Sequence, residues 1–216
     1  MKKFAPAIAA ALICLPMLAS AQLPGLPSLK NLPGLGNAAS TGGDVGGQND
    51  SLVRGYVAAN KDVLLANSQM ADALGLKDQA AASKATADAL TDGATKGNLE
   101  ESNKAVSAST DAVAAEMAKG PKLDAASKTK YQSGMAKLGQ GLLKYIGLRQ
   151  PAQAFSSSLS QASPLMLPKL QAGAYIVSQL PGGLSNLAAS MKNATAFAKS
   201  NDIPVPDDAT KAMASL

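Results

Sequence analysis

Apolar and polar residues follow one another along most of this chain with the spacing of an α-helix. The clearest case lies between Asp124 and Gln150, where large apolar residues recur at steps of four, three, four and three: Tyr131, Met135, Leu138, Leu142 and Tyr145. Because an α-helix has 3.6 residues per turn, these steps bring all five to one face. The same stretch contains four glycines, each of which costs roughly 1 kcal/mol relative to alanine inside a helix: Gly134, Gly139, Gly141 and Gly147. A helix that keeps them is predicted to have close neighbours or local bends.

Similar patterns predict helices on both sides of this segment. Before it we expect helices over 52–74 (capped by Asp50 or Ser51), over 77–91, and from a capping Asn98 to Gly120. After it we expect a short helix ending near residue 162, one that begins at Ser163-Pro164 and ends at Pro181-Gly182-Gly183, and one over 184–200. No segment keeps the period-two alternation of a strand. The sequence therefore predicts an all-α fold, an antiparallel bundle of five to seven helices.

Two asparagines interrupt the apolar face of the first predicted helix. Asn60 and Asn67 lie seven residues apart and inside the apolar arc. A buried asparagine needs hydrogen-bond partners and often fixes the register between packed helices. The alternative is a polar contact to a ligand inside the bundle.

The two ends of the chain differ from its middle. Residues 1–21 have a charged start, an apolar stretch and a small-residue site before Gln22, the pattern of an export signal. Residues 22–50 are rich in proline and glycine, include a doubled Leu-Pro-Gly-Leu, and are predicted to be a flexible leader. The bundle is assigned to residues 51–200, and residues 201–216 are predicted to be an extended tail. The protein is therefore expected in the periplasm or outside the cell.

The residue types that are missing restrict the chemistry. The chain has no histidine or tryptophan, and its one cysteine, Cys14, lies in the predicted signal. Ordinary zinc, copper and haem sites, thiol nucleophiles and histidine bases are therefore not expected. Ser127 and Lys130 have the S-x-x-K spacing of a serine–lysine dyad, but the companion motifs of those enzymes are missing. We expect no catalytic residues, no metal and no cofactor.

Charge is distributed unevenly, and this suggests a first candidate site. Residues 22–116 contain 7 Lys/Arg and 11 Asp/Glu, residues 117–150 contain 7 and 1, and residues 151–216 contain 4 and 3. Lys130, Lys137 and Lys144 recur at steps of seven, and this lysine stripe is predicted to contact an anionic envelope surface or a protein partner. The alternatives are a solvated face or pairing with the acidic first half. No nucleic-acid partner is expected, because the excess of basic residues after the signal is only three.

A second candidate site is an apolar pocket in the bundle core. Met135, Tyr145, Met166 and Tyr175 lie on the most apolar predicted helices, and methionines adapt to irregular ligands. The alternative is that these residues are ordinary core. The sequence thus favours an exported, non-enzymatic binding or envelope-associated module without a transmembrane span after the signal. A carrier of a lipid or small apolar ligand is the second possibility.

Overall fold

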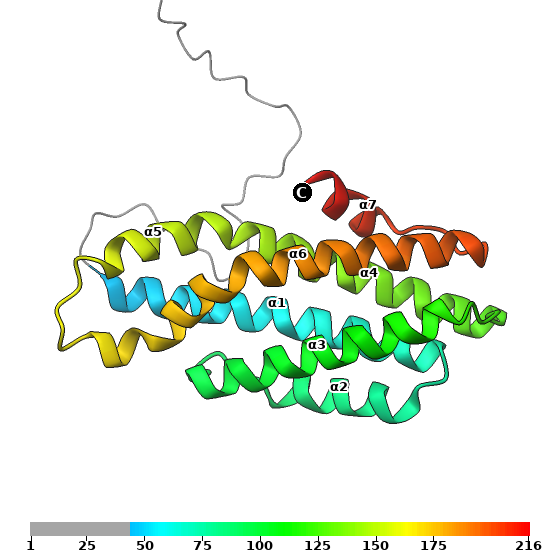
Figure 1. The fold of residues 1–216 in the computed structure, drawn as a ribbon, viewed down its shortest axis with the longest axis horizontal. Coiled ribbons are helices and arrows are strands. Elements are labelled where there is room, and N and C mark those ends of the chain that lie inside the picture. Colours follow the sequence, from blue (N-terminus) through cyan, green and yellow to red (C-terminus); the bar gives the residue numbers. More distant parts are fainter. Residues whose placement is uncertain (1–43) are drawn as a thin grey trace, which may run out of the picture.

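The computed structural model describes residues 44–216, and every secondary-structure element within this range is a helix (Figure 1). The predicted all-α class is therefore confirmed. The predicted export signal and most of the predicted leader lie outside the described residues. The elements are α1 (Val45–Ala73), α2 (Lys77–Ala89), α3 (Lys96–Ala118), α4 (Ala125–Gly147), α5 (Arg149–Leu159), the 3-10 helix η2 (Leu167–Leu170), α6 (Gln171–Ser200) and α7 (Asp207–Ala214).

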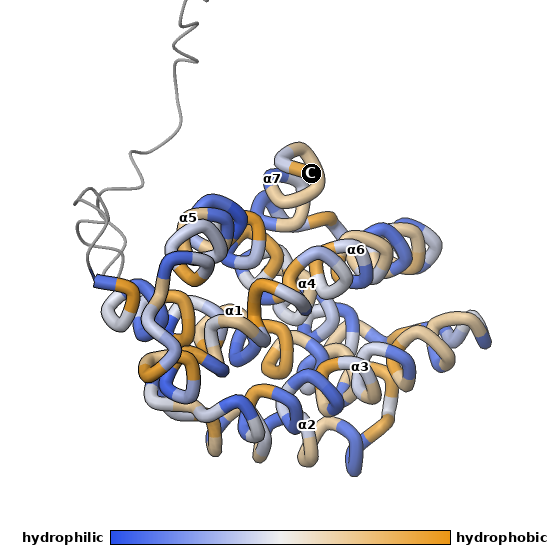
Figure 2. The backbone as a smooth tube through the Cα atoms, turned by 60° about the vertical axis from the view of Figure 1, so that its left-hand side comes forward, coloured by the Kyte–Doolittle hydropathy of each residue, from blue (hydrophilic) through white to orange (hydrophobic). Residues whose placement is uncertain are grey.

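Helix α1 lies at the centre of the molecule and contacts all the other elements except α7. It forms a four-helix core with α3, α4 and α6, in which α1 and α6 each pack against the other three helices and α3 and α4 each pack against both α1 and α6. The remaining helices lie outside this core: α2 covers α1 and α3, α5 covers α1 and α6, and α7 covers α4. Figure 2 shows α2 and α3 on one side of α1 and α5 and α7 on the other. Because α2 returns the chain between them, α1 and α3 run parallel, whereas α4 runs antiparallel to both.

The apolar stripe of α4 lies in the core, as predicted. Its five large residues are at most 2% exposed, and three of the four glycines allow close approach. A Cβ at Gly134 would lie 2.6 Å from Met70 Cγ, and one at Gly141 would lie 2.8 Å from Val63 Cγ2, both on α1. A Cβ at Gly139 would lie 2.5 Å from the backbone of α7. The prediction of close neighbours is confirmed at these three positions, whereas Gly147 faces open space.

The first helix begins earlier than predicted. Asp44, not Asp50 or Ser51, caps it by accepting a hydrogen bond from the backbone N–H of Gly47 at 2.8 Å. Asn49, assigned to the flexible leader, is buried, and its Oδ1 accepts from the N–H of Gly173 at 2.9 Å. The predicted boundary at residue 50 is therefore wrong, because tertiary contacts to α6 extend the helix through its glycines.

Helix α6 also differs from the prediction. Pro181-Gly182-Gly183 does not end it, and the two predicted helices are one helix of 30 residues that begins at Gln171. The residues after Ser163 form turns and η2 rather than the start of an α-helix. Apolar residues on both sides of Pro181, including Leu180 and Leu184, are buried, and their packing holds the helix together across the proline.

Two smaller corrections concern helix ends. Thr95 rather than Asn98 caps α3, and Asn98 is the reciprocal partner at the third helical position of a capping box. The C-terminal segment is not fully extended, since only the stretch around Ile203 to Pro206 lacks helix and α7 follows it. Among the residues described here, no helix has both the length and the apolarity needed to cross a bilayer.

Candidate functional site

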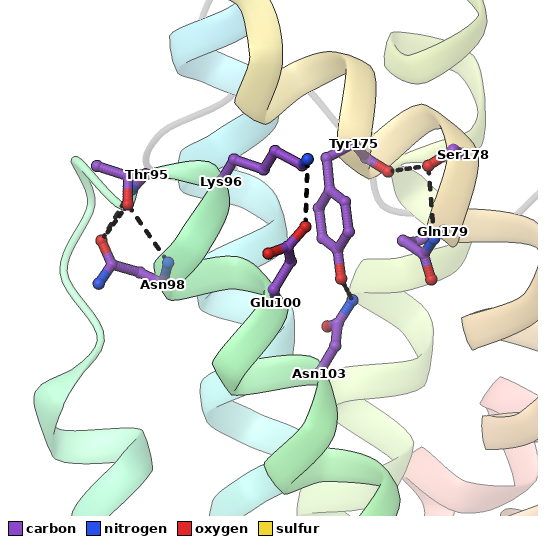
Figure 3. Close-up of polar contacts among 8 residues, drawn as sticks. All are labelled: Thr95, Lys96, Asn98, Glu100, Asn103, Tyr175, Ser178 and Gln179. Carbon is purple, nitrogen blue, oxygen red and sulfur yellow. Dashed lines mark hydrogen bonds and ion pairs between the residues drawn. The ribbon is translucent and has the colours of Figure 1, made fainter.

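A polar network in the four-helix core joins side chains from all four helices. Asn60 of α1 donates through Nδ2 to Ser102 Oγ at 2.5 Å and to Asn103 Oδ1 at 3.0 Å, both on α3. Its Oδ1 accepts from the hydroxyl of Tyr145 on α4. Tyr56 donates to Asn103 Oδ1 at 3.0 Å, and Asn103 Nδ2 donates to the hydroxyl oxygen of Tyr175 on α6 at 2.9 Å (Figure 3). Asn103 therefore links α3 to both α1 and α6.

Burial raises the pKa of two tyrosines of this network, Tyr56 and Tyr145. It raises the pKa of Tyr145 well above its usual value, and the neighbouring Tyr56 raises it further. Burial also raises the pKa of Tyr56, although its hydrogen bonds to Tyr145 and Asn103 act in the opposite direction. At neutral pH both hydroxyls keep their protons and act as hydrogen-bond donors.

A second polar layer lies one heptad further along α1 and α3. Asn67 Nδ2 donates to Ser109 Oγ at 2.8 Å and to Thr110 Oγ1 at 3.0 Å, repeating the contacts of Asn60 with a shift of seven residues in both helices. The Oδ1 of Asn67 is buried and has no hydrogen-bond partner. In this second layer, the position on α4 that corresponds to Tyr145 is seven residues earlier, because α4 runs antiparallel to α1. Leu138 occupies that position and cannot donate a hydrogen bond to Asn67 Oδ1. The two asparagines thus find partners between packed helices, as predicted, and their role in fixing the helix register stays a prediction.

A groove of about 430 Å³ opens between α3 and α6, directly over the first layer. Tyr56 and Tyr145 line its floor together with Asn103. Hydroxyl, carboxamide and carboxylate side chains line the walls: Ser107, Thr110 and Asp111 from α3, and Gln179, Asn186, Ser190 and Asn193 from α6. Asp111 is the only charged residue among the lining groups. The groove therefore offers many neutral hydrogen-bonding groups around a partly aromatic floor.

The groove exists because α6 has almost no side chain above Tyr145. Gly182 and Gly183 both line the groove, and a Cβ at Gly183 would lie 3.3 Å from the Tyr145 ring. A Cβ at Gly182 would meet no atom within 4 Å. A proline costs about 3 kcal/mol and each glycine about 1 kcal/mol relative to alanine in a helix interior, so this triplet is an expensive way to build α6. Such local costs in a well-packed protein are often found at functional sites.

The lysine stripe of α4 faces α1, and its lysines form ion pairs with acidic residues of α1. Lys144 Nζ is 2.6 Å from Asp62 Oδ2, Lys137 Nζ is 3.6 Å from Asp62 Oδ1, and Lys130 Nζ is 2.6 Å from Asp72 Oδ2. The lysine side chains are 38–55% exposed. The structure thus matches the alternative of pairing with the acidic first half, and the role in binding an anionic surface stays a prediction. The ammonium of Lys130 is directed at Asp72, not at Ser127.

The four residues of the predicted apolar pocket are only partly brought together. Tyr145 and Tyr175 meet in the polar network, and Tyr145 also lines the groove. Met135 is fully buried on α4, ten residues and about 15 Å along the helix from Tyr145. Met166 lies on the exposed connection before η2. Binding of an apolar ligand by these residues therefore stays a prediction.

The sequence reasoning missed the groove, although one signal was present. Gln179, Asn186 and Asn193 recur at steps of seven on α6, beside the proline–glycine triplet. The assumption that the triplet ends a helix separated these residues into two elements. No protein-family model matches the chain, and comparison with curated proteins and with solved structures gives no significant similarity, so the evidence for function is the chemistry of this groove.

Proposed function

We propose that this protein is an exported, non-enzymatic binding module that holds a neutral, hydroxyl-rich ligand in the α3–α6 groove. The observation that carries the proposal is the set of carboxamide and hydroxyl side chains on both walls of the groove. Carboxamides and hydroxyls donate and accept hydrogen bonds, as sugar hydroxyls do. The rings of Tyr56 and Tyr145 close the floor of the groove and are at most 2% exposed. Saccharide chains of the envelope match this chemistry and agree with the predicted export.

The position of the charges also favours a neutral ligand. Asp111 alone brings a formal charge to the groove, whereas the lysine stripe is engaged by Asp62 and Asp72 on α1. An anionic ligand in the groove would meet one carboxylate and no cation. A neutral ligand would meet hydrogen-bond partners on both walls. Its volume of about 430 Å³ lies within the range of small-ligand sites, roughly 300–1,000 Å³.

The test compares two glycine variants that differ in where they add a side chain. Gly182→Leu places an apolar side chain in the groove, and Gly147→Leu places the same side chain at a second open position outside it. Binding is measured by calorimetry with neutral oligosaccharides of two to six sugars, both glucans and N-acetylglucosamine chains. We expect binding by the parent and by Gly147→Leu, and at least a tenfold loss in Gly182→Leu.

Anionic vesicles serve as the counter-probe. A triple variant replaces Lys130, Lys137 and Lys144 by glutamine. If the parent binds phosphatidylglycerol vesicles but no oligosaccharide, and the triple variant no longer binds the vesicles, the lysine stripe is the contact surface and the groove proposal is wrong. Oligosaccharide binding that Gly182→Leu leaves unchanged also overturns it. Circular dichroism of each variant confirms that the helical fold is kept.

A further inference from the structure

Three of the four large apolar residues that are exposed in the described chain lie together at one end of the bundle. Leu165, Met166 and Leu167 are 86%, 36% and 46% exposed and follow one another in the connection before η2. Single exposed leucines are ordinary on protein surfaces, but consecutive ones form a patch that usually has a partner. We call these three residues the apolar loop.

The apolar loop lies at the same end as the start of α1. Helix η2 packs against α1, and the backbone N–H of Gly173 at the start of α6 donates to Asn49 near the start of α1. In Figure 1 the yellow connection between α5 and α6 and the blue start of α1 lie at the same end of the molecule. A cavity of about 750 Å³ is also found here, but its lining is largely polar and includes charged residues: Asp50, Arg54, Asp92, Lys96 and Lys169. The chain preceding Asp44 therefore emerges beside the apolar loop.

That preceding segment has a regular sequence pattern. Leucine recurs at every third position five times: Leu23, Leu26, Leu29, Leu32 and Leu35. Three of the intervening positions are prolines, and Lys30 is the only charged residue between Gln22 and Gly43. Three residues per turn is the repeat of the polyproline II helix, a form in which proline-rich segments are recognised. A contact in that form would present all five leucines on one side.

We propose that residues 23–35 dock on the apolar loop of the same chain. Eight residues, 36–43, connect Leu35 to Asp44 and span at most about 28 Å when extended. This reach covers the end of the bundle around Asn49 and η2. A short connection also keeps the segment at an effective concentration of roughly millimolar near the loop, so even a weak contact is populated. The three residues of the apolar loop carry no charge, and residues 23–35 carry only one, Lys30, so the two segments are complementary in polarity.

The test uses engineered disulfides. The protein cleaved after Ala21, as predicted, has no cysteine, so a pair of introduced cysteines reports only its own contact. Leu29→Cys with Leu165→Cys joins the segment to the apolar loop. The control combines Leu29→Cys with Leu216→Cys, a second exposed leucine on the C-terminal side of α7. In a glutathione redox buffer at low protein concentration, we expect at least tenfold more intrachain disulfide in the first pair.

Three results would overturn the proposal. Equal intrachain yields in the two pairs would mean that the segment samples the surface without docking. Interchain disulfides in the first pair would make a second copy the occupant. The third result comes from hydrogen exchange of the apolar loop with all five leucines replaced by serine, a change outside the folded bundle. If the apolar loop exchanges faster in this serine variant than in the parent, docking is supported. If the loop exchanges equally in both proteins and is protected only when phosphatidylethanolamine vesicles are added, it contacts a membrane and the proposal is wrong.

Discussion

Replacing Asn60 and Asn67 by alanine, one at a time, separates the polar network from simple core packing. Both side chains are fully buried on α1, and both substitutions remove the same atoms. They differ in their hydrogen bonds. Asn60 takes part in three, with Ser102, Asn103 and Tyr145. Asn67 makes two and leaves its Oδ1 unpaired.

The expected difference follows from these hydrogen bonds. Each hydrogen bond contributes about 1 kcal/mol net, and a buried polar group left without a partner costs about 1–3 kcal/mol. Asn60→Ala loses three bonds and leaves the Tyr145 hydroxyl without its acceptor, whereas Asn67→Ala loses two bonds and removes a carbonyl that was already unpaired. Asn60→Ala should therefore lower the free energy of unfolding by about 3 kcal/mol more than Asn67→Ala. That is a large share of the roughly 5–15 kcal/mol of a typical domain.

Urea unfolding followed by circular dichroism at 222 nm measures both values, and an unchanged slope with denaturant confirms that the same structure unfolds. If the two variants lose the same stability within about 0.5 kcal/mol, the hydrogen bonds by which Asn60 joins α1, α3 and α4 contribute no more than packing does, and the reasoning is wrong. A larger loss in Asn67→Ala would refute it as well.

Three further predictions test other parts of the fold. Gly134→Ala should destabilise the protein by about 1–3 kcal/mol, because the added Cβ would collide with α1. Gly147→Ala adds its Cβ in open space and should stabilise the protein by up to about 1 kcal/mol, measured in the same urea assay. Because the pKa of Tyr145 is raised in the folded state, this tyrosine loses its proton at a lower pH in the unfolded chain. The free energy of unfolding should therefore fall progressively above about pH 10. A free energy of unfolding that stays constant between about pH 9 and 11 would contradict this. Asp62→Asn should cost about 0.5–1 kcal/mol, since the lysines it pairs with are partly exposed, and the loss should shrink in 1 M salt.

The sequence predicted best where a single helix face was buried against the core. The stripe of α4 and the asparagines of α1 could be read from periodicity alone, because burial of one face imposes that period. Prediction failed where contacts between distant segments outweigh local preference. Asn49 is held in helix by Gly173, 124 residues away, and Pro181 is held in helix by the apolar residues around it. No local pattern contains that information.

The candidate site was harder to predict than the fold. The lysine stripe was visible in the sequence, but its partners Asp62 and Asp72 could be assigned only once α1 and α4 were seen side by side. The groove depends on two helices, α3 and α6, whose pairing is a property of the tertiary structure. Its walls are exposed polar residues, which in sequence look like any solvated surface.

The central position of α1 has a consequence for how the protein folds. The contacts of α1 with α2 are local and can form early, but its main partner α4 begins more than 50 residues after α1 ends. Because contacts between distant segments form slowly, the apolar face of α1 must wait, partly uncovered, until α4 arrives. During that interval, packing α3 against α1 out of register would leave Asn60 and Asn67 without their hydrogen-bond partners, which is costly. We therefore expect the three helices α1 to α3 to assemble first and α4 to complete the core in the rate-limiting step.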